Sequence, residues 1–362
     1  MIDYKKTISI LTVSYNQGEF IEQTIKSVIF QDGDFFIEYL IVDGGSTDNT
    51  LEILKKYKNL IENKKIKINC LGIDFKFISE KDEGPTNALN KGLRVLKGNI
   101  IGILNSDDIY AEGSFKKVIK AFQLNPKTEI VYGDVIFIDE RGNYIYLKKG
   151  KKILKLKDFF QENPIIQPET FIKKTVFEKI GFFDENFKFA NDYDFWIRCI
   201  KNNINFKYIH YPLVYFRKRK GARSSSSNPL IFVDTLKVQF KHFGITDFFL
   251  KNLGIYSSMF SNELGKDFDY GFEEILKLLF KEIRLNLNKN MIKKAKSFGY
   301  LKYAIYKIYE DKKYGMKSYF KSIINYPQIL FTKNNLIFLV RIFLMKGKIY
   351  YGLKTFLKIN KK

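Results

Sequence analysis

Short apolar runs alternate with helix-like segments through the first half of the chain. Strands are predicted where β-branched and aromatic residues follow one another, over residues 7–15, 39–42, 75–79, 100–104 and 130–137. Helices are predicted where apolar residues recur every three or four positions, over residues 19–30, 49–57 and 86–96. Strands that alternate with single helices of this length predict a mostly parallel sheet with helices on both faces, so the expected fold class is α/β.

The pattern changes near residue 217. Residues 217–228 are basic and small polar residues without a hydrophobic period, which is typical of a loop. Long helical patterns follow, for example over residues 272–286. We therefore expect an α/β domain over residues 1–225 and a basic, mainly helical region over residues 226–362.

Composition excludes several classes of protein. The 362 residues are 45% hydrophobic and 16% aromatic, so the chain can bury a core and global disorder is excluded. Two cysteines and two histidines argue against a disulfide-stapled scaffold and against a zinc site. Neither a signal-peptide pattern at the start nor a run of 18 apolar residues is present, and we expect an intracellular protein.

The positive charge is concentrated in the last part of the chain. Residues 281–362 hold 20 Lys and Arg residues against three acidic residues, within a net charge of +23. Such a block is either a solvated helical face or the contact surface for an anionic partner. The apolar residues 336–345, followed by lysines, suggest a helix that lies on an anionic membrane surface, and ordinary packing on the α/β domain is the alternative.

Carboxylates follow three of the predicted strands. Asp43 follows the second strand, Asp82 the third, and Asp107 with Asp108 the next. Ligands of parallel α/β sheets bind at the carboxyl ends of the strands. Clustered carboxylates repel one another unless a cation neutralises them, and Mg²⁺ or Mn²⁺ with oxygen ligands is suited to that task. Each acid alone could be a helix cap or a turn, but their common placement favours a site.

Five ordered motifs resemble one enzyme family. They are Asp-Gly-Gly-Ser-Thr-Asp-Asn-Thr at 43–50, Ser-Glu-Lys-Asp-Glu-Gly at 79–84, Leu-Asn-Ser-Asp-Asp at 104–108, Gln-Pro-Glu-Thr-Phe at 167–171 and Asn-Asp-Tyr-Asp-Phe-Trp-Ile-Arg at 191–198. Together with Gly-Phe-Phe-Asp at 181–184, they resemble the family 2 glycosyltransferases of GT-A fold, of the bacterial surface-polysaccharide type. The resemblance covers residues 7–225 and leaves the helical region unexplained.

The resemblance implies inverting sugar transfer from a nucleotide-diphosphate donor to a hydroxyl of a glycan or lipid-linked saccharide. Asp192 would be the general base, at the place of the Asp in the family's Glu-Asp motif. Asp107 and Asp108 would hold Mn²⁺ or Mg²⁺ in the family's DxD region, with a UDP-sugar as the leading donor candidate. Two departures from the family pattern are Asn105 at the first DxD position and Asn191 in place of the Glu.

The same resemblance assigns a set of residues to the donor. The nucleobase would lie between Asp43 and the end of the first strand, and Asp82 would orient the base or ribose. The assigned residues are Thr12, Tyr15, Asp43, Ser46, Asp82, Asn90, Asn105 and Arg217. Residues 217–220, with Arg219 where the family often has His, would form either a flap over the diphosphate or a basic linker.

Three other functions stay open at this stage. Asn105 and Asn191 are compatible with a catalytically inactive scaffold, and the basic tail with nucleic-acid binding, although no nucleic-acid motif is present. A nucleotidyltransferase would need a phosphate loop near the start, where residues 12–18 offer none. We expect a cytoplasmic enzyme, peripheral on the inner face of the cell membrane if its tail binds lipid, and no nucleic-acid partner.

Overall fold

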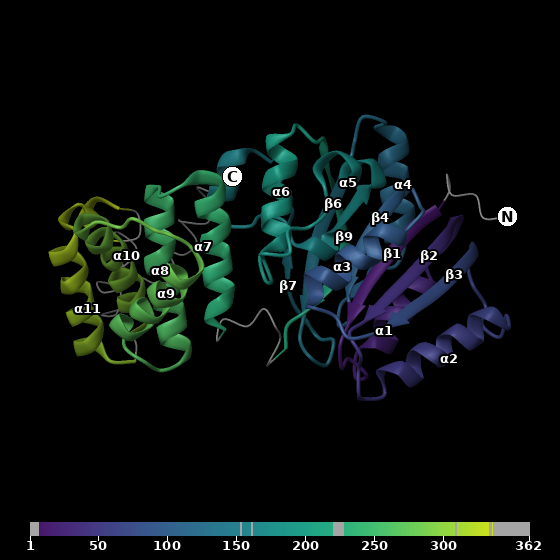
Figure 1. The fold of residues 1–362 in the computed structure, drawn as a ribbon, viewed down its shortest axis with the longest axis horizontal. Coiled ribbons are helices and arrows are strands. Elements are labelled where there is room, and N and C mark those ends of the chain that lie inside the picture. The colour runs from purple at the N-terminus through teal and green to yellow at the C-terminus, as the bar shows by residue number, and fades with distance from the viewer. Residues whose placement is uncertain are drawn as a thin grey trace, which may run out of the picture. The chain divides into compact units, whose positions relative to one another are not determined.

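The chain forms two compact units, residues 1–222 and residues 223–362. The computed structural model describes residues 7–152, 154–160, 162–219, 228–307, 310–332 and 335. The first unit combines a sheet with helices, and the second is helical (Figure 1). Each unit has its own hydrophobic core.

A nine-stranded sheet organises the first unit. Its strands are β1 (Thr7–Ser14), β2 (Gly33–Asp43), β3 (Cys70–Ser79), β4 (Ile100–Asn105), β5 (Ile109–Tyr110), β6 (Ile130–Ile138), β7 (Tyr144–Lys148), β8 (Thr170–Lys173) and β9 (Phe206–Arg217). They lie in the order β3-β2-β1-β4-β8-β6-β9-β5, and β7 pairs with the other side of β6. The pairs β3-β2, β2-β1, β1-β4 and β6-β9 are parallel, whereas β5, β7 and β8 pair antiparallel with their neighbours. The predicted α/β class with a mostly parallel sheet is confirmed.

The register of the parallel strands aligns their carboxyl ends. Ser14 at the end of β1 lies beside Asp43 at the end of β2, and Asp43 lies beside Ser79 at the end of β3. Because each of these strands ends at the same edge, the polar residues that follow them are brought to one edge of the sheet.

Helices connect these strands. They are α1 (Ile21–Ile29), α2 (Thr50–Glu62), α3 (Pro85–Val95), α4 (Ser114–Leu124), α5 (Lys174–Ile180) and α6 (Asn191–Lys201), with 3₁₀ turns at Leu156–Phe160 (η2) and Gln167–Glu169 (η3). The apolar face of α1, with Ile21, Ile25 and Val28, is fully buried against the sheet, as the spacing of its apolar residues requires. This packing holds the strands in place, and the loops that follow the strand ends are held with them.

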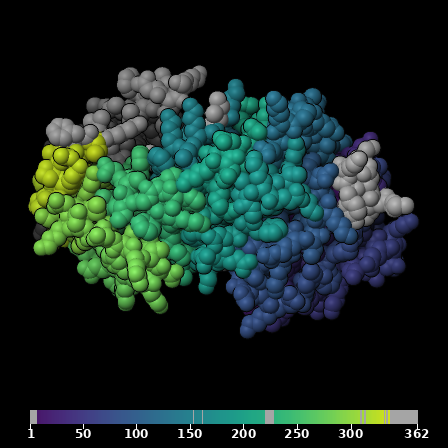
Figure 2. All heavy atoms as spheres, turned by 45° about the horizontal axis from the view of Figure 1, so that its top comes forward, coloured from purple at the N-terminus to yellow at the C-terminus, as the bar shows by residue number. Residues whose placement is uncertain are grey.

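The second unit is a helical bundle. Its helices are α7 (Pro229–Phe243), α8 (Asp247–Glu263), α9 (Phe268–Glu282), α10 (Lys289–Lys307) and α11 (Lys312–Asn325), followed by the 3₁₀ turn η4 (Pro327–Phe331). Side chains of Asn228, Thr246, Asp267 and Asp311 cap the starts of α7, α8, α9 and α11 by accepting backbone N–H bonds. In Figure 2, side chains fill the spaces between these helices on the face in view.

Two sequence predictions concern segments outside the described residues. Residues 336–362, which carry the expected membrane-surface helix, lie outside the described residues, as do residues 220–227 of the basic loop. Among the helices that are described, none has the length and apolar character needed to span a membrane.

Candidate functional site

Asp43 organises the loop that follows β2. Its side chain is fully buried, and its two carboxylate oxygens accept bonds from Gly45 N (3.1 Å), Ser46 N (2.9 Å), Ser46 Oγ (2.5 Å) and Ser79 Oγ (2.8 Å). Ser46 in turn accepts a bond from Asn16 N at 2.7 Å. Asp43 and Ser46 thus link the ends of β1, β2 and β3. Both were predicted to bind the donor, and in the structure both stabilise the conformation of this loop.

Tyr15 and Asp82 form the accessible part of this edge. The ring of Tyr15 is 59% exposed, directly after β1. A Cβ added to Gly44 would lie 2.7 Å from Asp82 Oδ2 and 3.5 Å from Tyr15 Cδ2, so both side chains lie close to this glycine and a larger residue would require the Asp82 carboxylate to move. The carboxylate of Asp82 also accepts a bond from Gly84 N at 2.8 Å, ahead of α3. The structure therefore brings together Tyr15 and Asp82, two of the residues that the sequence assigned to the donor.

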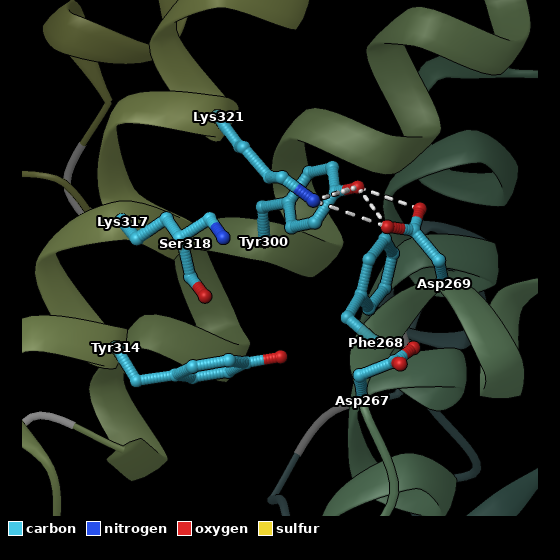
Figure 3. A pocket seen from close by; sticks show the side chains of 8 residues that line it. All are labelled: Asp267, Phe268, Asp269, Tyr300, Tyr314, Lys317, Ser318 and Lys321. Atoms are coloured by element: carbon cyan, nitrogen blue, oxygen red, sulfur yellow. Dashed lines mark hydrogen bonds and ion pairs between the residues drawn. The ribbon is translucent and has the colours of Figure 1, made fainter.

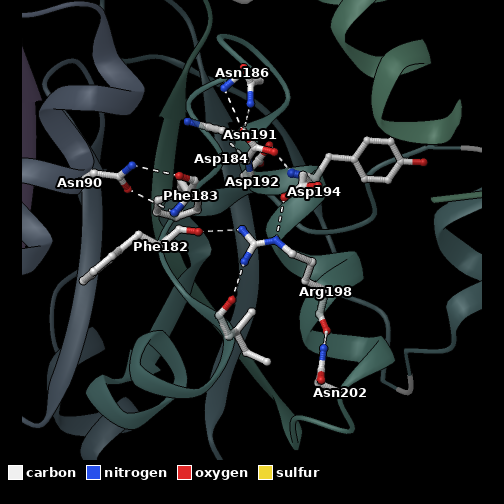
Figure 4. A network of polar contacts seen from close by, with 12 residues as sticks. Asn90, Phe182, Phe183, Asp184, Asn186, Asn191, Asp192, Asp194, Arg198 and Asn202 are labelled. Atoms are coloured by element: carbon white, nitrogen blue, oxygen red, sulfur yellow. Dashed lines mark hydrogen bonds and ion pairs between the residues drawn. The ribbon is translucent and has the colours of Figure 1, made fainter. Parts of the chain in front are cut away.

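Two other predicted donor residues face the interior. Thr12 is fully buried within β1, where its hydroxyl pairs with that of Tyr39 at 3.2 Å. The buried amide of Asn90 binds both backbone groups of Phe183 (Figure 4). Its Nδ2 also donates to Glu185 at 2.7 Å. Both ends of the Asn90 amide are thereby bonded to the turn after α5. This geometry does not support a donor contact for Thr12 or Asn90, because both side chains are already occupied inside the fold.

Asp107 and Asp108 differ sharply in their surroundings. The side chain of Asp107 is 19% exposed and pairs with Arg219, with 2.8 Å between Oδ2 and Nε. Asp108 is buried; its oxygens accept bonds from Arg217 N and from Asn105 Nδ2, both at 2.8 Å. Burial, and then the nearby charge of Asp107, raises the pKa of Asp108 well above its usual range. Asp107 is consequently the accessible carboxylate of the pair.

Two arginines from the end of β9 frame this carboxylate. Arg217 is buried and donates from Nε to the Asp107 carbonyl, from Nη1 to the Glu140 carbonyl and from Nη2 to Gln23 Oε1. Arg219, in contrast, is partly exposed and also contacts Gln17 at 3.2 Å. Arg217 thus braces the loop that carries Asp107, whereas the guanidinium of Arg219 can reach an anion beside it.

Asp192 lies at the start of α6, half-buried. Its Oδ1 accepts the Tyr193 N–H at 2.7 Å, and its Oδ2 accepts a bond from Asn163 Nδ2 at 2.9 Å. Burial raises the pKa of Asp192 to about 6, although the bonds from Tyr193 and Asn163 lower it. A carboxyl group with such a pKa is ionised at neutral pH and is suited to accept a proton.

Asn191 connects this helix to the start of α3. Its Nδ2 donates to Thr86 Oγ1 at 2.9 Å, and its Oδ1 accepts the N–H of Asp192 at 2.7 Å. Thr86 stands in the first turn of α3, two residues after Gly84 of the Asp82 loop. The residue that replaces the family's Glu therefore joins the two halves of the candidate site.

The motif pattern did not predict Asn163. It comes from the segment between η2 and η3, and no motif includes it, so only the folded chain places it beside Asp192. Arg219 had a weak signal, since it stands where the family often has His. Its ion pair with Asp107 could not be read from the sequence.

The residues present fit a divalent cation that is shared with a substrate. In the described part of the chain, no group of three or more His, Cys, Asp and Glu side chains gathers as a metal cage. Mg²⁺ and Mn²⁺, however, are often bound through one or two carboxylates together with substrate phosphates. Asp107 meets that requirement, because its carboxylate is accessible and lies next to positive groups that could accept a diphosphate.

A separate polar pocket of about 200 Å³ lies in the helical unit (Figure 3). Asp269 at its edge accepts bonds from Tyr300 at 2.6 Å, Lys296 at 3.1 Å and Lys321 at 3.3 Å. Burial would raise the pKa of Asp269, but these donors hold it below its ordinary value. The acid and its lysines thus neutralise each other, and their contacts stabilise the junction of α9, α10 and α11.

Comparison with known proteins identifies the family. The sequence model of the family described as Glycosyl transferase family 2 matches residues 9–181. An uncharacterized glycosyltransferase of Methanocaldococcus jannaschii is 30% identical over 218 residues, which are 59% of this chain and 71% of that protein. The minor teichoic acid biosynthesis protein GgaA of Bacillus subtilis is 25% identical over 224 residues, which are 60% of this chain and 48% of GgaA.

Solved structures agree on the fold. The crystal structure of S. aureus TarS 1–349 in complex with UDP-GlcNAc has a TM-score of 0.53 at 16% identity, and the match covers 89% of this chain and 92% of that one. The likeness extends across both units, whereas the sequence matches are confined to about the first 60% of the chain. The chain belongs to glycosyltransferase family 2, and its α/β unit has the GT-A fold.

Proposed function

We propose that the protein is an inverting glycosyltransferase that moves a sugar from a nucleotide-diphosphate donor to a hydroxyl of a glycan or lipid-linked saccharide. The observation that carries the proposal is Asp192, a half-buried carboxylate with a pKa of about 6 at the start of α6. Such a base takes the proton of the acceptor hydroxyl as that oxygen attacks the anomeric carbon. Attack opposite the leaving diphosphate inverts the configuration of that carbon.

The donor nucleoside is assigned to the edge formed by Tyr15, Asp43 and Asp82. The exposed ring of Tyr15 offers an apolar face for a base, and the carboxylate of Asp82 offers acceptors for ribose or base N–H groups. Asp43 and Ser46 keep this loop in place. A UDP-sugar is the first donor to test, because TarS 1–349 is solved with UDP-GlcNAc.

Asp107 is the residue that would hold Mn²⁺ or Mg²⁺, and Asp108 would support it from the interior. A bound divalent ion neutralises negative charge on phosphate oxygens. Arg219 lies beside Asp107 and would add positive charge to the same region, while Arg217 braces the loop. Asn105 keeps Asp108 in place through its amide, which an Asp at that position could not do without a proton.

The helical region of residues 226–362 is assigned to the acceptor or to an anionic membrane surface. Residues 281–362 supply 20 Lys and Arg residues for that contact. The test is co-sedimentation of the full chain with vesicles of neutral lipid and with vesicles that also contain anionic lipid. Binding that appears only with anionic lipid, and that added salt removes, would support the assignment; equal recovery in the supernatant would refute it.

The catalytic proposal is tested by measuring release of the nucleotide from the donor, with simple sugars as hydroxyl acceptors. Wild-type protein is expected to release UDP from a UDP-sugar in a Mn²⁺-dependent reaction, and Asp192→Asn to lose about a hundredfold or more of that rate. Both proteins should bind UDP equally well. Equal rates for the two proteins would remove Asp192 from the chemistry.

A further inference from the structure

Asp192 is held from outside its own helix by a short segment that precedes β8. Asn163 donates from Nδ2 to Asp192 Oδ2 at 2.9 Å. The other end of the same amide, Oδ1, accepts the N–H of Ile165 at 3.3 Å. Because the backbone takes the oxygen end, the N–H₂ end of Asn163 is the one that faces the carboxylate.

The segment that carries Asn163 is itself fixed at two further points. Lys148, at the end of β7, donates to the Pro164 carbonyl at 3.1 Å. Glu169, only 1% exposed within η3, accepts the N–H of Ile166 at 2.7 Å. Three consecutive residues after Asn163 are therefore tied to side chains or to the adjacent turn, and the amide has little freedom to turn away from Asp192.

The charges around Asp192 are few. From other elements, Lys148 is the charged group that acts on Asp192, and it favours the ionised carboxylate. On α6 itself, Asp194 is paired with Arg198 at 2.7 Å. The amide of Asn163 is thus the one neutral donor from another element that contacts this carboxylate in the described residues.

The charge of Lys148 also acts on Glu169. Burial raises the pKa of Glu169 to about 7, Lys148 opposes that rise, and Asp134 adds to it. Tyr132 and Tyr208 lie near enough to feel the charge of Glu169. The charge of Lys148 consequently favours the ionised form of both Glu169 and Asp192.

We infer that Asn163 is a positioning residue for the general base, and that Lys148 and Glu169 hold the segment from which it acts. The inference rests on the proposed function, because it gives Asn163 a role through Asp192. The amide N–H stabilises the ionised carboxylate and leaves Asp192 Oδ1 and Oδ2 in a fixed orientation toward the acceptor hydroxyl. Removal of this donor raises the pKa of Asp192, since a hydrogen bond to the charged form favours that form.

The test compares Asn163→Asp with wild type. Aspartate has the same shape and keeps the oxygen that accepts from Ile165, but it replaces the donor by an anionic oxygen. Asn205→Ala is the matched control, because Asn205 Nδ2 also donates to a carboxylate, that of Glu129 at 3.2 Å, at an exposed site. Lys148→Met is a second variant in case Asn163→Asp folds poorly.

Two readouts are needed. The first is the pH profile of kcat/KM, with an unchanged KM for the donor. Its acidic limb should move upward by about one pH unit or more in Asn163→Asp, and by less but in the same direction in Lys148→Met, because Lys148 contributes less to the Asp192 pKa than Asn163 does. The second is the carboxyl ¹³C shift of Asp192 against pH, assigned by its loss in Asp192→Asn. Asn205→Ala should move neither.

An unchanged Asp192 titration in a folded Asn163→Asp protein would overturn the inference, as would a fall in rate by the same factor at every pH. The NMR titration also separates this inference from the proposed function. If the Asp192 pKa rises in the variant while the wild type transfers no sugar, the contact is upheld and the assigned reaction is wrong.

Discussion

The guanidinium of Arg219 lies 2.8 Å from the carboxylate of Asp107, the accessible acid of the candidate metal site. The two side chains are 22% and 19% exposed, so the pair is partly shielded from water. A divalent cation that binds Asp107 must displace or share this arginine. The pair therefore competes with metal until an anionic substrate offers Arg219 another partner.

The first prediction concerns this competition. Arg219→Ala is expected to bind Mn²⁺ without nucleotide up to about fivefold more tightly than wild type, because a partly exposed ion pair contributes about 1 kcal/mol or less. The same variant should bind UDP more weakly in the presence of Mn²⁺. Free Mn²⁺ measured by electron paramagnetic resonance checks both statements. Lys56→Ala, which removes the exposed pair with Glu22, is the control, and tighter Mn²⁺ binding there would contradict the account.

A second prediction separates the two neighbouring aspartates. Asp107→Asn should leave stability nearly unchanged and abolish Mn²⁺-dependent UDP binding. Asp108→Asn should lower the free energy of unfolding by about 1–3 kcal/mol, because one of the donors from Arg217 and Asn105 loses its acceptor. Urea unfolding and nucleotide titration measure the two effects.

The bond between Asn105 and Asp108 offers a rescue. The double variant N105D with D108N exchanges donor and acceptor and can restore the hydrogen bond in the reverse direction. Its stability should exceed that of the single variant D108N. A double variant no more stable than D108N would show that the bond does not account for the loss.

A third prediction follows from the raised pKa of Asp192. The Asp192 carboxyl ionises near pH 4 in the unfolded protein and near pH 6 in the folded one. As pH rises from about 4 to about 6, the unfolded state loses this proton first, so the free energy of unfolding of the wild type falls. Asp192→Asn lacks this loss and should be more stable than wild type above pH 6, by up to about 2 kcal/mol. Activity has the opposite dependence, because the base must be ionised and kcat/KM falls as pH drops below about 6.

Unfolding of both proteins at pH 4 and pH 8 tests this relation. Glu169 also has a raised pKa, but it is common to both proteins and cancels in the comparison. A stability difference that stays constant from pH 4 to pH 8 would mean that Asp192 ionises normally in the folded protein.

A fourth prediction concerns Asn90. Asn90→Ala should lower the free energy of unfolding by about 1–3 kcal/mol, since it leaves the buried backbone groups of Phe183 without partners. Its affinity for UDP should match that of wild type, as measured by calorimetry. A large loss of UDP affinity without a loss of stability would restore Asn90 to the donor site.

The sequence predicted the parallel part of the fold better than the rest. Strands such as β1 and β2 are continuous apolar runs, and their order with α1 and α2 follows from alternation alone. The antiparallel strands β5 and β8 have two and four residues, too few for a period to be recognised. Their place in the sheet depends on pairing with distant residues, which local pattern does not contain.

The candidate site shows the same difference between residues that a local pattern identifies and residues that only the folded chain brings into place. Asp107 and Asp192 stand out because each lies in a motif at a predicted strand or helix end. The family resemblance assigned Asn90 to the donor, but its amide binds the backbone of Phe183, 93 residues away. Asn163 has no motif and gains its role only through a contact across 29 residues. Motifs therefore selected the candidate residues, and the contacts of each side chain show which of these residues are already occupied inside the fold.

The most direct test of the central claim is the stereochemistry of the sugar product. Wild-type protein, Mn²⁺, an α-linked UDP-sugar and a hydroxyl acceptor are mixed, and the anomeric proton of the new glycoside is observed by NMR, with Asp192→Asn measured in parallel. The account predicts a β-linked product from wild type and a rate at least about a hundredfold lower for Asp192→Asn, with UDP affinity retained. An α-linked product, or equal rates for the two proteins, would contradict it.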